Sequence, residues 1–593
     1  MNAAASQSLA KPMRIIQTLF LVALAAAAAS PRAAALETLR PEQLKSGMKG
    51  YGLSVFKGTQ PERFEIEVLG VLKNAFPKQD MILIRLSGAN LEKHKVIAGM
   101  SGSPIYVNGR LIGALAYGWG FENEPLAGVT PIHNMLAELD RKPERRNGLG
   151  AATQTENNSA HGTEACPPGR AAPTFAGSAN PRPLLTPLSL GGFSPRLIAA
   201  IGDELTRFGL MPTAAGGGSG EPQRASARLE PGSAIGVQLI RGDLNAVAIG
   251  TVTWVGNNKV LAFGHPFFHA GPIEAPAVLG EVHTIMSSVE RSFKLATSAG
   301  DAGALVGDWQ SCIVADTQRR APMIPVTVTV NNPDSGHHER YTLEVIRNDR
   351  FTPLFVRAAI TQAIASTAGS SQDTTVQVAL TAELANRALR VTDTFYHPTG
   401  GLLSGKALAP LTDLFAAPFG HPVVRRIDAQ INAVLQRRTA EIKRAYFDQA
   451  EVERGHTARL AVVLKPFGGA EVTRIIPIQV PAATDTLRQV AVTLLAGDNA
   501  PPDIAPPDNQ ADYLEALEKQ HRTTDLVAIV QTPGQGLRYR GKLLKRLPPS
   551  ILAVLDDDSR RDVVGTADVQ QIVVPTDWVL SGQAAARVPI RQE

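Results

Sequence analysis

Cysteine is almost absent from this sequence, because 593 residues contain only Cys166 and Cys312. Two cysteines can form one bond in an oxidising compartment, but they cannot form a disulfide framework. No C-x-x-C or H-E-x-x-H motif occurs, so we predict no metal site. The stretch AAGGGSGEPQR lacks the Gly-Lys-Ser/Thr end of a phosphate-binding loop and is typical of a flexible linker. We therefore predict no metal and no cofactor.

Aromatic residues make up only 5% of the chain, and the net charge is a mild +5. There is no block of Lys and Arg and no basic stripe with interleaved aromatic residues, so a nucleic-acid partner is not indicated. The 52 glycines and 42 prolines favour many short strands and turns over helical bundles. Because the chain is too long for one core, we predict a mainly β protein with about three to five domains.

Long apolar runs are also missing, with one short exception near the N-terminus. From Met13 the sequence MRIIQTLFLVALAAAAASPRAAA has a basic start, an apolar core and three alanines before Leu36. This pattern predicts a signal peptide over residues 1–35 with cleavage at or near Leu36. The alternative is a membrane anchor, but the apolar run of about 15 residues falls short of the ~20 that a span needs. We expect an exported protein, periplasmic or secreted, whose mature chain has no transmembrane segment.

The stretch IAGMSGSPIYVNGRLIGALAYGW, residues 97–119, contains the first candidate site residue. Ser101 lies between Gly99 and Gly102, and Pro104 stops a helix from following. Asn-Gly at 108–109 then predicts a β-hairpin, which excludes the strand–turn–helix serine elbow of α/β-hydrolases. The turn resembles the G-x-S-G-x-P turn of chymotrypsin-like proteases, which implies a nucleophile at Ser101 and an oxyanion hole formed by the N–H groups of Gly99 and Ser101. The alternative is a polar serine in a glycine-rich hairpin entry.

A nucleophilic serine needs a base, which is usually a histidine. His265 follows an apolar strand-like run in VLAFGHPFFHAGPIEAP and is held between Gly264 and Pro266. We predict His265 as the base, with His269 as the nearest rival. The alternative is a histidine that only ends a strand.

Composition along the chain divides it into several segments. The prediction is a signal peptide (1–35), a serine-bearing β-barrel unit (36–140), a disordered linker (141–183), a helical connector (184–228), a histidine-bearing β-barrel unit (229–350), a mixed α/β connector (351–424), a β-sandwich-like domain (425–485) and a mixed α/β segment (486–593). Within the connector, Ser194 before Pro195 predicts a capped amphipathic helix over 194–209.

Two blocks of the sequence resemble one known family. GMSGSPIYVNGRLIGAL and TWVGNNKVLAFGHPF are similar to segments of the SpoIVB-type serine peptidases, the sporulation signalling proteases. With their flanks, these blocks cover residues 45–140 and 230–310. The resemblance implies a chymotrypsin-like double β-barrel with Ser101 as nucleophile and His265 as base. It also implies cleavage of a protein or peptide substrate, such as a membrane-associated regulatory protein.

The sequence departs from the family in two ways. The histidine block follows the serine block instead of preceding it, which a site between two barrels can accommodate because triads occur in several chain orders. The family's aspartate shortly before the serine is replaced by Leu86 or Ser87. Asp308 is the first candidate for the missing acid and Asp301 the second, and a Ser-His dyad is the third possibility.

Two functions follow from these observations. The first is an exported serine endopeptidase that cleaves an envelope or membrane-associated protein. The second is a non-catalytic envelope scaffold or adhesion protein that retains the barrel pair. For the first, we expect Ser101 and His265 to face each other across the barrel interface, outside any packed core.

Overall fold

The computed structural model describes residues 37–120, 123–141, 180–216, 228–368, 373–398, 408–420, 422–480, 482, 488–502, 507–539, 542–544 and 563–591. The predicted signal peptide and most of the predicted 141–183 linker, including Cys166, lie outside these residues. Within them, no helix is both long enough and apolar enough to cross a membrane.

The first domain is a closed six-stranded barrel. Its strands are β1 (Lys49–Ser54), β2 (Glu62–Phe76), β3 (Gln79–Ser87), β4 (Pro104–Val107), β5 (Arg110–Gly118) and β6 (Leu126–Pro131). They pair in the order β1–β2–β3–β6–β5–β4, and β4 returns to β1. Alternate residues of β2 and β3 fill the interior, as a strand period of two requires: Phe64, Ile66, Val68, Ile82, Ile84 and Leu86. Two short helices, α2 (Leu91–His94) and α3 (Ile132–Ala137), flank this barrel.

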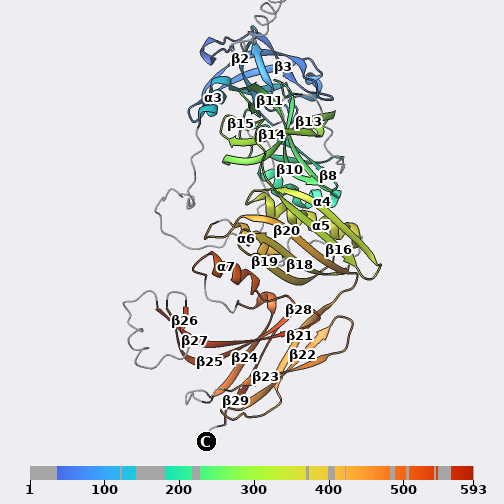
Figure 1. Cartoon of the computed structure of the whole chain (residues 1–593), viewed down its shortest axis with the longest axis vertical. Helices are drawn as coiled ribbons and strands as arrows, with labels where there is room; N and C mark the ends of the chain where they lie inside the picture. The colour runs from blue at the N-terminus through green and yellow to red at the C-terminus, as the bar shows by residue number, and fades with distance from the viewer. Residues whose placement is uncertain are drawn as a thin grey trace, which may run out of the picture.

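The second domain repeats the same strand order. Its strands are β10 (Ala234–Gly242), β11 (Asn245–Gly256), β12 (Lys259–Ala262), β13 (Gly271–Met286), β14 (Phe293–Asp308) and β15 (Ile313–Asp316). They pair as β10–β11–β12–β15–β14–β13, and β13 returns to β10. Figure 1 shows the two barrels stacked along the long axis of the molecule. The predicted fold class, a mainly β multidomain protein with a double β-barrel, is confirmed.

Both predicted hairpins form, and for the same local reason. Asn108 and Gly109 join β4 to β5 with φ of 51° and 73°, and Asn257 and Asn258 join β11 to β12 with φ of 49° and 61°. Two successive positive φ angles give the turn whose twist matches antiparallel strands. Asparagine and glycine tolerate this conformation best.

Short elements lead from the first barrel to the second. β7 (Arg182–Pro183), which falls within the predicted linker, pairs with β5 of the first barrel. β8 (Thr186–Gly191) pairs with β11 and with β9 (Leu210–Ala214). Between them lies α4 (Pro195–Arg207), which begins as predicted because the Ser194 hydroxyl accepts the N–H of Leu197 at 3.4 Å.

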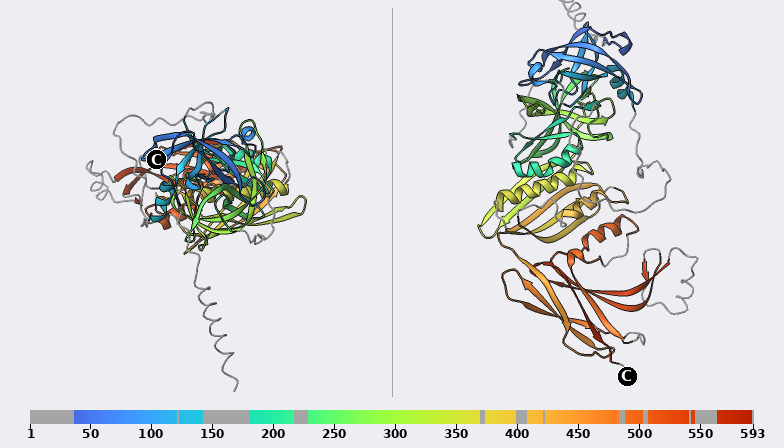
Figure 2. Two further views of the ribbon diagram at one scale, coloured as in Figure 1. Left: turned by 90° about the horizontal axis from the view of Figure 1, so that it is seen from above. Right: turned by 180° about the vertical axis from the view of Figure 1, so that it is seen from behind.

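A third layer extends the sheet of the second barrel. It contains β16 (Met323–Asn332), β17 (His337–Ile346), β18 (Thr374–Leu384), β19 (Ala388–His397) and β20 (Val424–Val434) in the order β19–β18–β20–β16–β17, and β17 joins β10. The helix α5 (Phe351–Ala368) packs on this sheet beside α4, and α6 (Ala409–Phe415) lies next to it. Figure 2 shows this helical layer between the second barrel and the sheet.

The C-terminal part of the chain is a two-sheet sandwich. One sheet contains β21 (Thr439–Phe447), β22 (Thr457–Pro466), β23 (Val472–Gln479) and β28 (Val579–Ser581). The other contains β24 (Gln489–Ala496), β25 (Asp525–Tyr539), β26 (Lys542–Leu544), β27 (Val563–Pro575) and β29 (Gln583–Pro589). One apolar core lies between the two sheets. Segments 425–485 and 486–593 therefore share one domain, whereas β20 belongs to the third layer because it pairs with β16 and β18.

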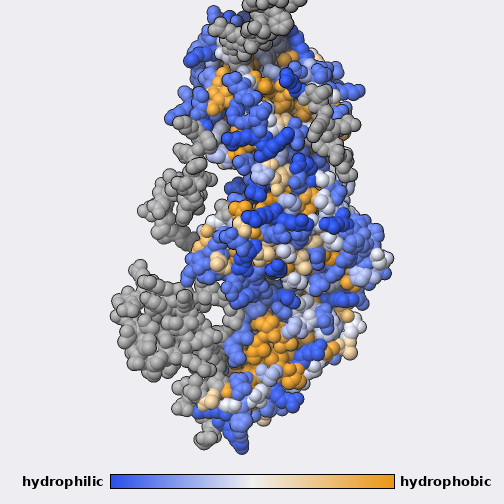
Figure 3. All heavy atoms as spheres, viewed as in Figure 1, coloured by the Kyte–Doolittle hydropathy of each residue, from blue (hydrophilic) through white to orange (hydrophobic). Residues whose placement is uncertain are grey.

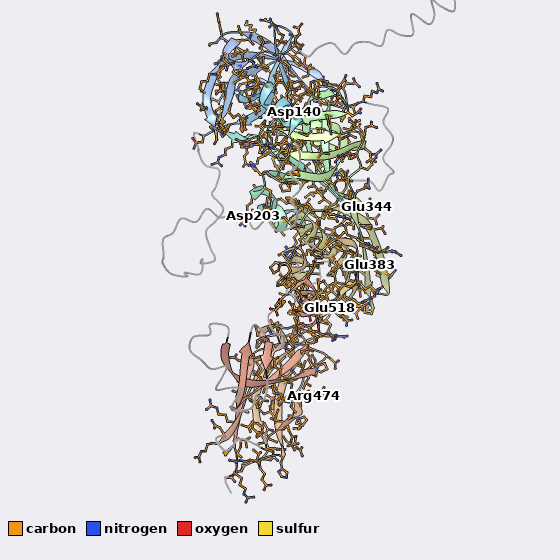
Figure 4. The ribbon with its side chains drawn as sticks, turned by 60° about the vertical axis from the view of Figure 1, so that its left-hand side comes forward. Asp140, Asp203, Glu344, Glu383, Arg474 and Glu518 are labelled. Carbon is orange, nitrogen blue, oxygen red and sulfur yellow. The ribbon has the colours of Figure 1, made fainter. Side chains whose placement is uncertain are left out.

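Polar contacts hold the segment that joins β24 to β25 of the sandwich against the third layer. Glu518, at the end of α7 (Gln510–Glu518), accepts the N–H of Arg390 at 2.9 Å and forms an ion pair with Arg387. In Figure 4, Glu518 lies between the sheet that carries Glu383 and the sandwich that carries Arg474. Figure 3 shows apolar side chains on the visible face of the molecule at the sandwich end. Large apolar residues exposed in this domain are Tyr446, Phe467, Ile475 and Val573.

Candidate active site at the barrel junction

Ser101 and His265 occupy the same place in the two barrels. Each lies on the connection between the third and the fourth strand: Ser101 between β3 and β4, and His265 between β12 and β13. Asp308 is the last residue of β14, the fifth strand of the second barrel. The repeated strand order therefore gives the serine turn and the histidine turn equivalent positions.

The two turns meet at backbone atoms near the middle of the barrel junction. The N–H of Gly102 donates to the carbonyl oxygen of Leu115 at 2.7 Å, and a Cβ placed on Gly264 would lie 3.3 Å from the same oxygen. The N–H of Thr251 donates to the carbonyl oxygen of Ser101 at 2.8 Å. Thr251 is on β11, so the serine turn of one barrel is hydrogen-bonded to a strand of the other.

The junction buries both predicted catalytic side chains. Ser101 is 0% exposed and His265 is 2% exposed. The expectation that they lie outside a packed core is therefore wrong, because the turns are enclosed between two barrels rather than standing at a free surface. Neither Ser101 Oγ nor His265 Nε2 has a hydrogen-bond partner among the described residues, so the two are not hydrogen-bonded to each other.

His265 is held as a neutral imidazole. Its Nδ1 lies 2.8 Å from the carbonyl oxygen of Pro266, which places the ring hydrogen on Nδ1 because a carbonyl can only accept. Burial lowers the pKa of His265 to about 4. Nε2 is therefore left as a free acceptor, which is the state that a general base requires.

The predicted oxyanion-hole donors are also free. Among the described residues, no acceptor is found for the backbone N–H of Gly99 or of Ser101. In contrast, the carbonyl groups on the other side of these two peptide bonds do have donors. Ala98 O, in the same peptide unit as the N–H of Gly99, accepts the N–H of Lys294 at 3.1 Å. Met100 O, in the same peptide unit as the N–H of Ser101, accepts the Ser103 hydroxyl at 2.7 Å. N–H and C=O point in opposite directions across a trans peptide. Because these bonds fix the directions of the two carbonyl groups, both N–H groups point away from the donors that hold the carbonyls.

Asp308 supports the histidine turn rather than the ring. One of its oxygens accepts the N–H of Phe267 at 2.7 Å, and the other accepts those of Phe268 at 2.6 Å and Ala270 at 3.0 Å. Burial raises the pKa of Asp308, and the three N–H groups act against that shift. The second candidate acid, Asp301, forms ion pairs with Arg320 at 3.1 Å and Arg241 at 3.7 Å. The structure therefore gives both acids partners other than the imidazole.

We expect Asp308→Ala to destabilise the protein strongly, because it leaves three N–H groups of a partly buried turn without an acceptor. Bonds to a charged acceptor contribute about 1.5–3 kcal/mol each, which gives about 4.5–9 kcal/mol for three bonds. Removing the carboxylate also removes the cost of burying it, so we expect a loss of roughly 3–6 kcal/mol in the free energy of unfolding, measured by urea denaturation. Asp301→Ala, which removes only half-exposed ion pairs, is the matched control and should cost about 1 kcal/mol or less. Equal effects of the two substitutions would contradict this role of Asp308.

A cavity of about 610 Å³ adjoins the serine turn. Val96 lines it, three residues before Gly99. Ser292 from the turn between β13 and β14 and Phe293 at the start of β14 line it too. Ser292 O accepts the N–H of Ala98 at 2.9 Å, so this turn is attached directly to the segment before the serine. Apolar lining residues include Leu184, Met211, Met286 and Leu295. Ligand sites typically have volumes of about 300–1,000 Å³, so the cavity is large enough for peptide side chains.

Sequence reasoning missed three polar residues at this junction. Lys294, Ser54 and Thr251 are all fully buried next to the serine turn. In the sequence, only the alternation of residues along the strand indicated that Lys294 is buried. Lys294 precedes the buried Ala296 by two residues, so both side chains lie on the same face of β14. No group of three possible metal ligands is found among the described residues.

One family model matches the chain. Residues 27–136 match the model described as SpoIVB peptidase S55. The match includes the whole first barrel with Ser101 and ends before the histidine block. Comparison with curated proteins and with solved structures found no match. The roles of Ser101, His265, Gly99, Asp308 and Asp301 therefore stay predictions, and the comparison shows that residues 27–136, which include the first barrel, are similar to the SpoIVB peptidase S55 family.

Proposed function

We propose that the protein is an exported serine endopeptidase that cleaves an envelope or membrane-associated protein, with Ser101 as nucleophile and His265 as base. One observation carries the proposal: four groups that such a mechanism uses are all free at one junction. They are Ser101 Oγ, His265 Nε2 and the N–H groups of Gly99 and Ser101. Buried polar groups are nearly always paired, so a cluster of unpaired ones is typical of a functional site.

The chemistry follows from these four groups. Ser101 Oγ bonds to the carbonyl carbon of the scissile peptide while His265 Nε2 takes the hydroxyl proton. The N–H groups of Gly99 and Ser101 stabilise the oxyanion. The C–N bond then breaks, and the imidazolium gives its proton to the leaving amine. A water molecule, deprotonated by the same imidazole, hydrolyses the acyl ester and restores Ser101.

Substrate access requires a change at the junction, because Ser101 is fully buried. A peptide substrate can approach through the cavity beside the serine turn. The turn between β13 and β14 lines this cavity and is hydrogen-bonded to Ala98 through Ser292, so it lies between the cavity and the segment that precedes Ser101. We infer that a peptide enters from this side and displaces that turn.

The burial of Ser101 also favours the second candidate function. A non-catalytic scaffold that retains the barrel pair has no need of an accessible hydroxyl, and Ser101 Oγ has no accessible surface and no bond to His265. The two functions differ in one measurable property, which is the reactivity of Ser101.

Labelling by a fluorophosphonate probe distinguishes them. We expect the wild-type protein to be labelled at Ser101, identified by peptide mass mapping, and Ser101→Ala to remain unlabelled under the same conditions. Ser103→Ala is the control for the second serine of the motif: the label should still be found at Ser101, although it forms more slowly because Ser103 Oγ bonds the carbonyl of Met100. Absence of labelling in the folded wild-type protein, with and without added peptide, would favour the scaffold.

The export part of the proposal rests on the N-terminal sequence pattern. We expect the mature protein to begin at Leu36 or within a few residues of it, because the apolar core is followed by three alanines. N-terminal sequencing of the protein recovered from the cell envelope or the medium tests this. A mature chain that still carries Met13 would contradict it.

A further inference from the structure

Lys294 is a buried lysine without a charged partner. It is 0% exposed at the second position of β14, and its Nζ donates to two hydroxyl groups, Ser54 Oγ at 2.9 Å and Thr251 Oγ1 at 3.2 Å. No carboxylate forms an ion pair with it among the described residues. Burying an unpaired amine is costly, so its retention calls for an explanation beyond packing.

One path of hydrogen bonds leads from Lys294 to Gly99. Thr251 Oγ1 accepts from Lys294 Nζ, and its own hydrogen goes to the carbonyl oxygen of Gly99 at 2.8 Å. The aliphatic part of Lys294 also packs on Gly99, where a Cβ would lie 3.1 Å from Cδ of the lysine. Lys294 therefore contacts Gly99 directly and restrains its carbonyl group through Thr251.

A second path leads from Lys294 to Met100. The hydroxyls of Ser54 and Ser103 are 3.0 Å apart, and Ser103 Oγ lies 2.7 Å from the carbonyl oxygen of Met100. Ser103 has one hydroxyl hydrogen, and it goes to Met100 O because a carbonyl can only accept. The hydrogen between the two serines then comes from Ser54, so Ser54 must accept from Lys294.

These contacts reach both peptide units of the oxyanion hole. The peptide that contains Met100 O also contains the N–H of Ser101, and the peptide that contains Ala98 O also contains the N–H of Gly99. The side chain of Lys294 anchors the first carbonyl through Ser54 and Ser103, and the backbone N–H of Lys294 anchors the second directly at 3.1 Å. Fixing each carbonyl fixes the direction of its N–H.

We propose that Lys294 is the positioning residue of the oxyanion hole. Its side chain holds the N–H of Ser101 through the Ser54–Ser103 hydroxyls and, through Thr251, holds the Gly99–Met100 peptide that joins the two donors. Its backbone N–H holds the N–H of Gly99 through the carbonyl of Ala98. This inference rests on the proposed function, since it concerns the same reaction. It assigns Lys294 no contact with the substrate. The chain of hydroxyls also transmits the charge of the ammonium, because each bond polarises the next one.

Lys294 changes its protonation state near neutral pH, so a pH profile of activity can detect its charge. Burial lowers its pKa to about 7, and no titratable side chain contributes to the shift. The groups that face the amine are the hydroxyls of Ser54 on β1 and Thr251 on β11. The backbone of Gly99 packs against the aliphatic part of the same side chain. Above pH 7 the amine loses its proton and polarises the hydroxyl chains less. Activity should therefore fall on the alkaline side with a midpoint near 7.

The rate of fluorophosphonate labelling at Ser101 tests the role, because the phosphoryl oxygen of the adduct occupies the oxyanion hole. We expect Lys294→Met to lower the maximal labelling rate about 10- to 100-fold, as substitutions that disturb positioning groups do, with little change in the half-saturating probe concentration. The alkaline limb near pH 7 should disappear. Ser54→Ala and Thr251→Val should lower the rate in the same way, whereas Thr251→Ser, which keeps the hydroxyl, should restore it.

Lys259→Met is the matched control, because Lys259 also lies in the second barrel but forms a partly exposed ion pair with Asp316 at 2.8 Å. It should label like the wild type. If Lys294→Met does not fold, the labelling rates of the Ser54 and Thr251 variants test the role of Lys294 instead. Wild-type labelling with unchanged rates and pH profiles in the folded variants would overturn this inference and leave the proposed function intact. Failure of the wild type itself to label would instead count against the proposed function.

Discussion

Removing Ser101 and His265 together will cost hardly more activity than removing either one. We expect Ser101→Ala and His265→Ala each to lower hydrolysis of fluorescently labelled casein by about 10³-fold or more, to a similar residual rate. The double variant should fall to that same rate, because the two groups act on one proton transfer and neither works alone. Initial rates of the three variants, measured at equal protein concentration, provide the comparison.

His269→Ala is the control for this experiment, because His269 is exposed and is the second histidine that the sequence offers as a base. It should keep most of the activity. Additive losses for Ser101 and His265 would show that the two residues do not act as a unit. Retained activity in His265→Ala together with a loss in His269→Ala would move the role of base to His269.

Substituting Gly102 by alanine will break the barrel junction. A Cβ on Gly102 would lie 1.9 Å from the carbonyl oxygen of Thr251 and 2.4 Å from the backbone nitrogen of Phe263. Both are main-chain atoms of the second barrel, so no side chain can move aside. Gly102 also has a φ of +95°, which disfavours any side chain. We expect at least about 3 kcal/mol of lost stability by urea denaturation, together with the loss of Ser101 labelling.

Gly109→Ala separates backbone strain from the clash. Gly109 also has a positive φ, +73°, but nothing lies within 4 Å of the position of its Cβ. Its substitution should cost only about 1–2 kcal/mol, the typical penalty for a side chain in a left-handed conformation. If Gly102→Ala costs no more than Gly109→Ala, the two barrels are not in tight contact at this point.

Features set by neighbouring residues were predictable. Asn108-Gly109 and Asn257-Asn258 determine their hairpins, because adjacent residues that tolerate positive φ select this turn. Ser194 determines the start of α4 through a bond to an N–H three residues away. The GMSGSP turn indicated the serine motif, because its glycines and proline restrict the local backbone.

Features set by distant contacts were not predictable from one sequence. β20 pairs with β16 across about a hundred residues, and β21 pairs with β28 across a still longer stretch, so the domain boundaries in the last third of the chain differ from those expected. Pairing at such separations depends on the packing of whole sheets, which the alternation of residues within one strand does not encode.

The sequence by itself determined the mainly β composition, the turn before β4 that contains Ser101, the turn after β12 that contains His265, and the glycines that let those turns approach other backbone. Only the tertiary structure decided that both turns are buried, that Asp308 holds the histidine turn rather than the ring, and that Lys294 lies behind the oxyanion-hole peptides. The physical reason is the range of the interactions. Turn geometry depends on φ and ψ of a few consecutive residues, whereas desolvation and hydroxyl hydrogen bonds at the junction depend on side chains from three separate strands, β1, β11 and β14.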